Sequence, residues 1–201
     1  MDKADILSSY KFFSKFYVFY FNPGRATAIQ KMDLHQNEKI LEVGVGTGMS
    51  LSLYPQDVQI VGVDLSKDML SQAIHQMERL QLKNVQLMLM DAQNLEFADD
   101  SFDKSVAMFV ASVTPNPVLM INEMKRVTKA NGMIYVLNHF SQRKSLMNFF
   151  EKKLSLFSSI IGFEPLFYLD EFLEQINVKD FEDIPIRPLG YWRLLCFKNS
   201  K

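Results

Sequence analysis

A glycine-rich loop after a short apolar run is the part of the chain best suited to hold a cofactor. The run Lys39-Ile-Leu-Glu-Val43 leads into Gly44-Val-Gly-Thr-Gly48, so the stretch reads E-x-G-x-G-x-G from Glu42. Glycines at this spacing allow a sharp turn and let a ligand approach the backbone closely at the beginning of a helix. A dinucleotide-binding loop would place its third glycine at position 49, where this chain has Met49. The pattern therefore predicts a cofactor loop of another kind.

Two acidic residues follow the next two predicted strands. Asp64 comes directly after residues 58–63, and Asp91 with Ala92 follows residues 85–90. A carboxylate at the end of the second strand can accept hydrogen bonds from both hydroxyls of a ribose. One such acid alone is more often a loop or cap residue. Two of them behind a glycine loop favour a cofactor site.

Alternating strands and helices are expected to position these residues. Short apolar runs separated by amphipathic helices are typical of a parallel sheet that is covered on both faces. Right-handed crossovers then predict a doubly wound, mainly parallel, seven-stranded α/β sheet with ligands at the carboxyl ends of the strands. The predicted strands are 39–43, 58–63, 85–90, 102–110, 133–137, 178–184 and 191–198, and the predicted helices are 67–80, 117–128 and 169–176.

The length and composition indicate one globular domain. With 201 residues we expect a single domain, made of N-terminal helices in 1–33 and a sheet domain in 39–201 that carries a helical insertion at about 143–163. The net charge of −1 gives no overall basic field, so we expect no nucleic-acid partner. The single cysteine, Cys196, cannot form an internal disulfide and provides no metal cluster, so we expect no metal.

No stretch is long enough to predict a membrane span. A transmembrane helix needs about 18–20 continuous apolar residues, whereas the run at 16–21 has six. Together with the single cysteine, this leads us to expect a protein of the reducing cytoplasm. We also expect a monomer.

The glycine loop and the two acids resemble those of the class I S-adenosylmethionine-dependent methyltransferases, which have a Rossmann-like fold. The resemblance implies S-adenosylmethionine as cofactor and S-adenosylhomocysteine as product. It implies that Asp64 binds the ribose, Asp91 the adenine amine and the backbone N–H of Ala92 the adenine ring. Met69 taken alone would be interpreted as a core residue. The other implied cofactor contacts are Glu42, Gly44, Val45, Gly46, Gly48, Leu65, Met69 and Met108.

Nearly the whole chain is similar to the bacterial soluble-type phosphatidylethanolamine N-methyltransferases. The stretches that carry the resemblance are ILEVGVGTGMSLSLYP, VGVDLSKDML, FDKSVAMFVASVTPNP, EMKRVTKANG, YVLNHF and PLGYWRLL. The resemblance implies N-methylation of phosphatidylethanolamine and its mono- and dimethyl forms towards phosphatidylcholine. Because the first four stretches are shared with quinone methyltransferases, a quinone or other lipophilic small molecule is the alternative substrate. A non-catalytic sensor that binds the cofactor and a membrane is a third interpretation.

Five residues are candidates for the substrate side of the reaction. The attacking amine must be neutral, and His139 after the fifth strand could take its proton, although it could equally be a structural strand-end histidine. Tyr17 could orient the amine through its hydroxyl or simply pack in a helix. Arg25 and Arg193 match the geometry of a lipid phosphate, with a surface residue and a solvated strand position as the alternatives. Tyr191 could line the substrate pocket.

An aromatic segment before the sheet domain predicts a contact with lipid. Seven aromatic residues lie within 12–25, more than one core contact would use, and such an excess indicates a second apolar partner. We expect a lid helix that contacts the membrane surface, with Lys11 and Lys15 at the level of the head groups. The basic stretch 143–153 could be an amphipathic helix on anionic lipid or a solvated helix on the sheet. These features predict a peripheral protein on the inner face of the membrane.

Overall fold

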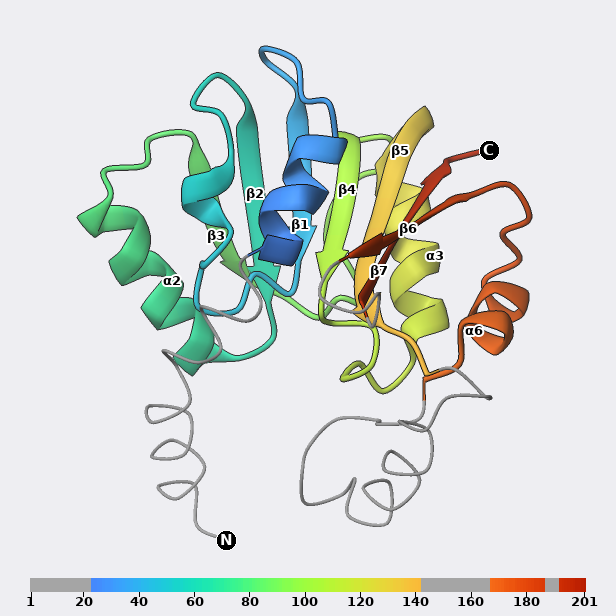
Figure 1. Ribbon diagram of the computed structural model, residues 1–201. Coiled ribbons are helices and arrows are strands. Elements are labelled where there is room, and N and C mark those ends of the chain that lie inside the picture. Colours follow the sequence, from blue (N-terminus) through green and yellow to red (C-terminus); the bar gives the residue numbers. More distant parts are fainter. Residues whose placement is uncertain (1–22, 142–166, 187–191) are drawn as a thin grey trace, which may run out of the picture.

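A seven-stranded sheet in the order β3-β2-β1-β4-β5-β7-β6 forms the centre of the computed structural model, in which residues 23–141, 167–186 and 192–201 are described (Figure 1). Neighbouring strands pair in parallel from β3 to β5, and β7 pairs antiparallel with both β5 and β6. This arrangement confirms the predicted mainly parallel, seven-stranded sheet. The strands are β1 (Lys39–Val43), β2 (Gln59–Asp64), β3 (Val85–Leu89), β4 (Phe102–Met108), β5 (Thr128–His139), β6 (Glu182–Ile186) and β7 (Trp192–Lys198).

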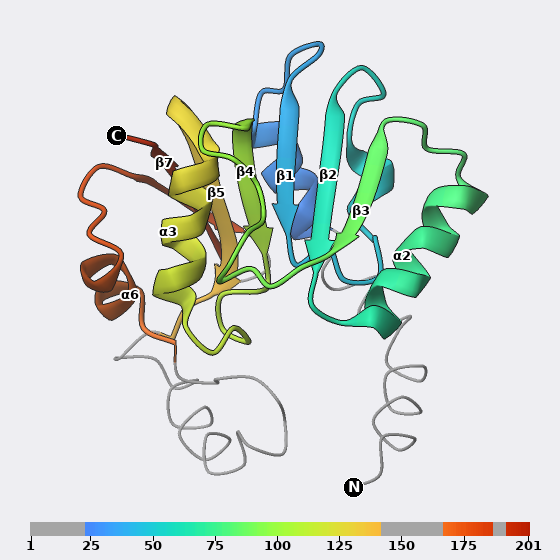
Figure 2. The ribbon, with the colours of Figure 1, turned by 180° about the vertical axis from the view of Figure 1, so that it is seen from behind.

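Helices cover both faces of this sheet. Helix 23–31 lies in front of β1 and β4 in Figure 1, and α3 (Pro117–Val127) lies on the opposite face, in front of β4 and β5 in Figure 2. The remaining helices are α2 (Lys67–Arg79), α6 (Leu169–Gln175) and the short 3-10 helix η1 (Leu51–Leu53). The predicted doubly wound arrangement is therefore present.

Alternate residues of each central strand face the two helical layers. In β1, Leu41 and Val43 belong to the core cluster that contains Met120 of α3, while Ile40 belongs to the cluster that contains Met32 next to helix 23–31. All five residues are buried. This explains why the strands are continuous apolar runs in the sequence, since each has a core on either side.

Two late strands differ from their predicted bounds. β5 begins at Thr128, directly after α3, and its pairing with β4 shifts register between Phe102 and Lys104, so the strand starts well before the predicted residue 133. β6 lies at 182–186 instead of 178–184 and contains Pro185. Proline is tolerated there because β6 is the edge of the sheet, with one strand partner.

Hydrogen bonds join the two described segments that border residues 142–166. The backbone N–H of Ser141 donates to the carbonyl of Phe167, and the N–H of Phe167 donates to the Ser141 hydroxyl. The predicted lid helix and the whole predicted insertion at 143–163 lie outside the described residues. Of the helices that are described, none has both the length and the apolar character to cross a membrane.

Candidate active site

The glycine loop after β1 shows two different uses of glycine. Gly44, Gly46 and Gly48 all have left-handed backbone, with φ of 68°, 57° and 77°. A Cβ on Gly44 would lie 2.1 Å from a methyl carbon of Val110, and one on Gly48 would lie 3.1 Å from the Cα of Ala73. At Gly46 the nearest atom is the Gly44 carbonyl oxygen, 4.0 Å away. Packing therefore requires Gly44 and Gly48, whereas the open space at Gly46 fits the approach of a ligand.

We expect Gly46→Ala and Gly44→Ala to separate these two uses. The methyl group at position 46 should enter the ligand space and weaken the binding of S-adenosylhomocysteine by about tenfold, with a strain cost to folding of about 1–2 kcal/mol. The methyl group at position 44 should collide with Val110 and lower the unfolding temperature much more. Calorimetric titration and thermal unfolding of both variants check this, and equal loss of stability in the two would contradict it.

Asp64, at the end of β2, holds the glycine loop in place through a hydrogen bond to its backbone. Its Oδ2 accepts a hydrogen bond from the backbone N–H of Gly46 at 2.8 Å, and its Oδ1 accepts one from Ser66 at 2.8 Å. Each carboxylate oxygen has a second lone-pair site, so both can still accept from ribose hydroxyls. The next side chain, Leu65, is 66% exposed. An apolar side chain left in water beside this carboxylate fits the predicted contact with an adenine ring.

Asp91 lies at the same edge of the sheet. The backbone N–H of Met90 donates to the carbonyl of Asp64 at 3.0 Å, which joins the ends of β2 and β3. Oδ1 of Asp91 accepts hydrogen bonds from the backbone N–H and the side chain of Gln93. The structure thus brings together Gly46, Asp64 and Asp91, as the sequence predicts.

Glu42 lies beneath this loop in the protein interior. It is 2% exposed, and its two oxygens accept hydrogen bonds from the Ser50 hydroxyl at 2.6 Å and the Tyr54 hydroxyl at 2.8 Å. Burial raises the pKa of Glu42, while the two hydroxyls and the charge of Arg25 act in the opposite direction. The structure therefore gives Glu42 internal partners that the sequence did not indicate, and its contact with a cofactor stays a prediction.

The other predicted cofactor residues differ in exposure. Val45 and Met108 are buried in the core, so their side chains face the protein interior. Met69 and Ala92 are half-buried. Contacts of these four residues with a cofactor stay predictions. The open Gly46, the remaining lone pairs of Asp64 and the exposed Leu65 are the observations that fit a nucleoside cofactor.

A second group of residues lies at the carboxyl ends of β4 and β5 and at the amino end of the adjoining, antiparallel β7. Phe109 directly follows β4 with a φ of 64°, and its ring meets that of Trp192 edge to face at 5.2 Å. The guanidinium carbon of Arg25 lies 4.9 Å above the centre of the Phe109 ring. His139 is 9% exposed and lies opposite Trp192 in the β5–β7 ladder. The structure therefore brings Arg25 and His139 to one region, as the sequence predicts.

Phe109 is a site residue that sequence reasoning missed. A bulky side chain with positive φ is uncommon and marks a place where the surrounding structure imposes a strained backbone, often at a functional site. Its N–H donates to the carbonyl of Leu137 at 2.6 Å, which holds this conformation. In the sequence Phe109 falls inside the predicted strand 102–110, so the apolar pattern does not mark it as a site residue, whereas β4 ends at Met108 in the structure.

The two arginines have different environments. Arg25 is half-buried, and burial lowers its pKa while the negative charge of Glu42 acts to raise it. Arg193 donates two hydrogen bonds to the carboxylate of Asp183, from Nε at 2.7 Å and from a terminal nitrogen. Asp183 would therefore compete with a phosphate for Arg193. That either arginine binds a phosphate stays a prediction. Tyr17 and Tyr191 lie outside the described residues.

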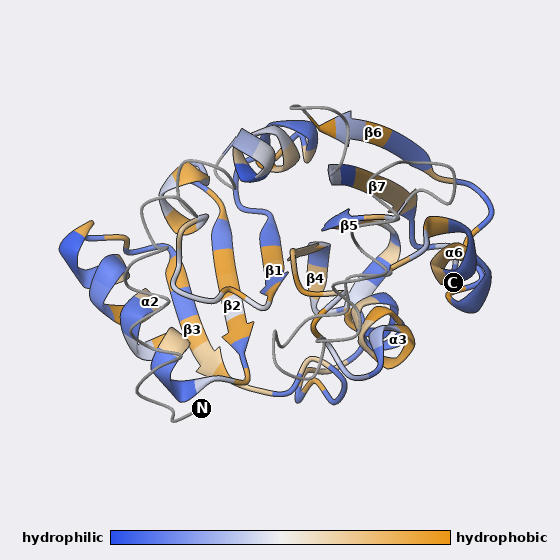
Figure 3. Ribbon diagram, turned by 60° about the horizontal axis from the view of Figure 1, so that its bottom comes forward, coloured by the Kyte–Doolittle hydropathy of each residue, from blue (hydrophilic) through white to orange (hydrophobic). Residues whose placement is uncertain are grey.

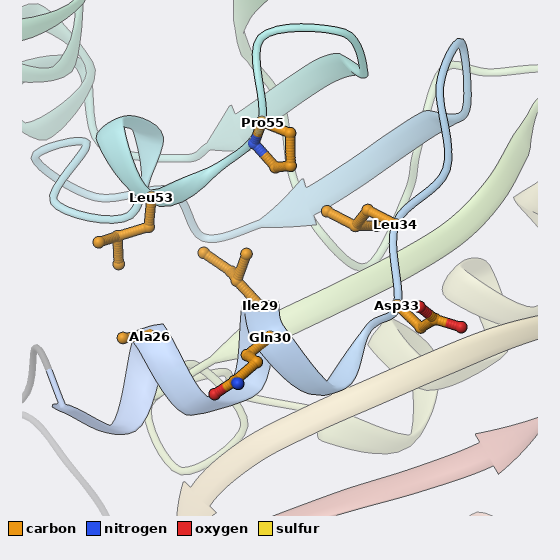
Figure 4. Close-up of a pocket in the computed structure, with 7 residues that line it drawn as sticks. All are labelled: Ala26, Ile29, Gln30, Asp33, Leu34, Leu53 and Pro55. Atoms are coloured by element: carbon orange, nitrogen blue, oxygen red, sulfur yellow. The ribbon is translucent and has the colours of Figure 1, made fainter.

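The two groups divide the edge of the sheet, as Figure 3 shows when the strand ends are turned forward: β1, β2 and β3 lie on one side of β4, and β5 and β7 on the other. A separate groove of about 310 Å³ lies between helix 23–31 and the end of η1 with the residues that follow it (Figure 4). No predicted cofactor residue lines this groove. Its lining residues are Ala26, Ile29, Gln30, Asp33, Leu34, Leu53 and Pro55.

Comparison with known proteins agrees with this arrangement. A family model described as a methyltransferase domain matches residues 34–163. The chain is 37% identical over 161 residues to a phosphatidylethanolamine N-methyltransferase of Cereibacter sphaeroides, covering 80% of this chain and 79% of that relative. The chain belongs to the class I S-adenosylmethionine-dependent methyltransferases. Its cofactor is S-adenosylmethionine.

Two further proteins are similar to this methyltransferase, one in sequence and one in structure. A demethylmenaquinone methyltransferase of Bacillus cereus is 31% identical over 140 residues, covering 68% of this chain and 57% of that relative. A solved structure of an S-adenosylmethionine-dependent methyltransferase from Aquifex aeolicus is 17% identical, with a TM-score of 0.64 and coverage of 90% of this chain and 91% of that one. The methyltransferase fold is thus confirmed, and relatives with both lipid and quinone substrates are similar to this chain.

Proposed function

We propose that this methyltransferase methylates the amine of phosphatidylethanolamine and of its mono- and dimethyl forms. The observation that carries the proposal is the 37% identity to the phosphatidylethanolamine N-methyltransferase of Cereibacter sphaeroides, which extends over 79% of that protein. The similarity to the demethylmenaquinone methyltransferase is lower, at 31%, and spans 57% of its length.

The residues beyond β4 and β5 have suitable chemistry for an amine substrate. Bound S-adenosylmethionine supplies an electrophilic methyl group on its sulfonium. If the head-group amine titrates like a lysine, about one in 2,500 is neutral at pH 7, so the enzyme must favour the neutral form. The rings of Phe109 and Trp192 exclude water there, which lowers the pKa of an amine, and His139 can accept its proton. Orienting the amine in line with the methyl group supplies much of the remaining rate enhancement.

Transfer of radiolabelled methyl groups to a panel of lipids tests the proposal. The panel contains phosphatidylethanolamine, its mono- and dimethyl forms, demethylmenaquinone and phosphatidylserine as a control amine. We expect label in the first three, with the products resolved by chromatography. Label in the quinone alone would refute the proposal. Binding of the cofactor without release of S-adenosylhomocysteine on any lipid would favour a sensor.

A quinone substrate is the second candidate, because the demethylmenaquinone methyltransferase of Bacillus cereus matches 68% of this chain. Such a substrate needs the same cofactor residues and the same apolar rings but no phosphate-binding arginine. Arg25→Gln should therefore raise the KM for phosphatidylethanolamine if Arg25 binds phosphate, and a soluble phosphoethanolamine head group should compete with the lipid. A quinone enzyme would be insensitive to that competitor.

We also propose that the aromatic N-terminal segment binds the enzyme to the inner face of the membrane. We propose separately that the enzyme is a monomer. We expect deletion of residues 1–21 to abolish binding to anionic liposomes and activity on lipid, because seven aromatic side chains lie between Phe12 and Phe21. The affinity for S-adenosylhomocysteine and the unfolding temperature should change little, since Arg25 and the described sheet remain. Flotation with liposomes and the lipid assay measure this. A fully active truncation would refute the lid.

A further inference from the structure

We propose that Gln93 is a positioning residue for the adenine of the cofactor. It holds the carboxylate of Asp91 so that Oδ2 faces the 6-amino group, and this makes the site selective for adenine over a 6-oxo purine. The inference rests on the predicted contact between Asp91 and the adenine amine. It does not depend on which substrate receives the methyl group.

Both donors of Gln93 converge on one oxygen of Asp91. The backbone N–H of Gln93 donates to Oδ1 at 2.9 Å, and the side-chain Nε2 donates to the same atom at 3.2 Å. Within the described part of the chain, no residue donates to Oδ2. An ionised carboxylate only accepts hydrogen bonds, so Oδ2 is the atom that can receive the amine of an adenine.

The carboxamide of Gln93 is itself held in one orientation. Its Oε1 accepts a hydrogen bond from the backbone N–H of Asn116 at 3.1 Å, so the donor Nε2 must face Asp91. Asn116 in turn caps α3, since its Oδ1 accepts from the backbone N–H groups of Val118 and Leu119. Gln93 therefore ties the carboxylate to the beginning of a packed helix.

This connection has a consequence for specificity. A 6-amino group donates a hydrogen bond to a fixed carboxylate, whereas a 6-oxo group in the same place brings two acceptors together and is rejected. Without the side chain of Gln93, the Asp91 carboxylate keeps only the backbone N–H of residue 93 as a donor and can rotate about its side-chain bonds. A rotating carboxylate binds the amine less well and rejects the 6-oxo group less strongly. Ribose binding through Asp64 should be unaffected.

Calorimetric titration with two product analogues tests the inference. S-adenosylhomocysteine carries the 6-amino group, and S-inosylhomocysteine carries a 6-oxo group in its place. We expect the wild-type protein to bind the first at least about tenfold more tightly. Gln93→Ala should weaken the binding of S-adenosylhomocysteine by about tenfold and leave the affinity for S-inosylhomocysteine within about twofold of the wild-type value. Gln93→Glu, which keeps the size and loses the donor, should act in the same direction.

The matched control is Gln72→Ala. Gln72 lies on the exposed side of α2, where its Nε2 donates to the carbonyl of Asp68, and its loss should change neither affinity. Equal weakening of both analogues by Gln93→Ala would mean that Gln93 merely supports the loop, and would overturn the inference. Unchanged affinity for S-adenosylhomocysteine would overturn it as well. If the wild-type protein binds S-adenosylhomocysteine and S-inosylhomocysteine equally well, Asp91 does not contact the adenine amine, and the inference is overturned.

Discussion

Asp64→Ala will weaken the binding of S-adenosylhomocysteine at least tenfold, or about 1.4 kcal/mol. The carboxylate has two functions that the substitution removes together. It offers acceptors to the ribose, and it holds the backbone N–H of Gly46 at 2.8 Å and that of Ser66 at 2.8 Å. The glycine loop thus loses its outer attachment at the same time as the site loses a ligand. Calorimetric titration at constant pH and salt measures the loss.

Two variants make this measurement specific. Asp68→Ala removes an exposed acid from the first turn of α2 and should leave the affinity unchanged. Asp64→Asn keeps one acceptor oxygen but places an amide where the second backbone N–H points, so an intermediate affinity is expected. Wild-type affinity in Asp64→Ala would show that the cofactor does not bind at this edge of the sheet.

The sequence was sufficient for the parts of the fold that depend on burial along one strand. Residues 39–43 were predicted as a strand and form β1 with the same bounds. Asp64 and Asp91 were predicted at the ends of neighbouring strands, and they lie at one edge of the sheet because β2 and β3 are parallel and adjacent. Such a prediction succeeds because a strand buried on both faces leaves a continuous apolar run.

Features that depend on contacts between distant residues were not predictable in this way. Arg193 pairs with Asp183 across two antiparallel strands, and nothing in the local sequence distinguishes this from a solvated arginine. The positive φ of Phe109 is imposed by its bond to Leu137 of β5. The early start of β5 depends on a register shift against β4, which has no counterpart in the apolar pattern.

The buried group around Glu42 gives the largest expected effect on stability. Glu42→Ala should lower the free energy of unfolding by about 3–5 kcal/mol at neutral pH. The substitution removes the acceptor of two buried hydroxyls, those of Ser50 and Tyr54, and takes away the negative charge of Glu42 that acts on the half-buried Arg25. Chemical denaturation followed by circular dichroism measures the change. Tyr54→Phe removes one of the hydrogen bonds and should cost about 1–2 kcal/mol.

The pH dependence of Glu42→Gln separates the charge from the packing. Because burial raises the folded pKa of Glu42 above its ordinary value of 4.5, the folded state binds a proton that the unfolded state has released. As pH rises from about 4.5 through the folded pKa, this carboxyl must therefore lower the stability of the wild-type protein. Glu42→Gln has no such titration, so the stability of the wild type relative to this variant should fall over that window. The same comparison removes the opposite contributions of Asp103 and Glu123, whose pKa values are lowered and which are present in both proteins. Parallel stability curves for the two proteins would mean that the Glu42 carboxyl has an ordinary pKa, and that Arg25 and the two hydroxyls fully offset its burial.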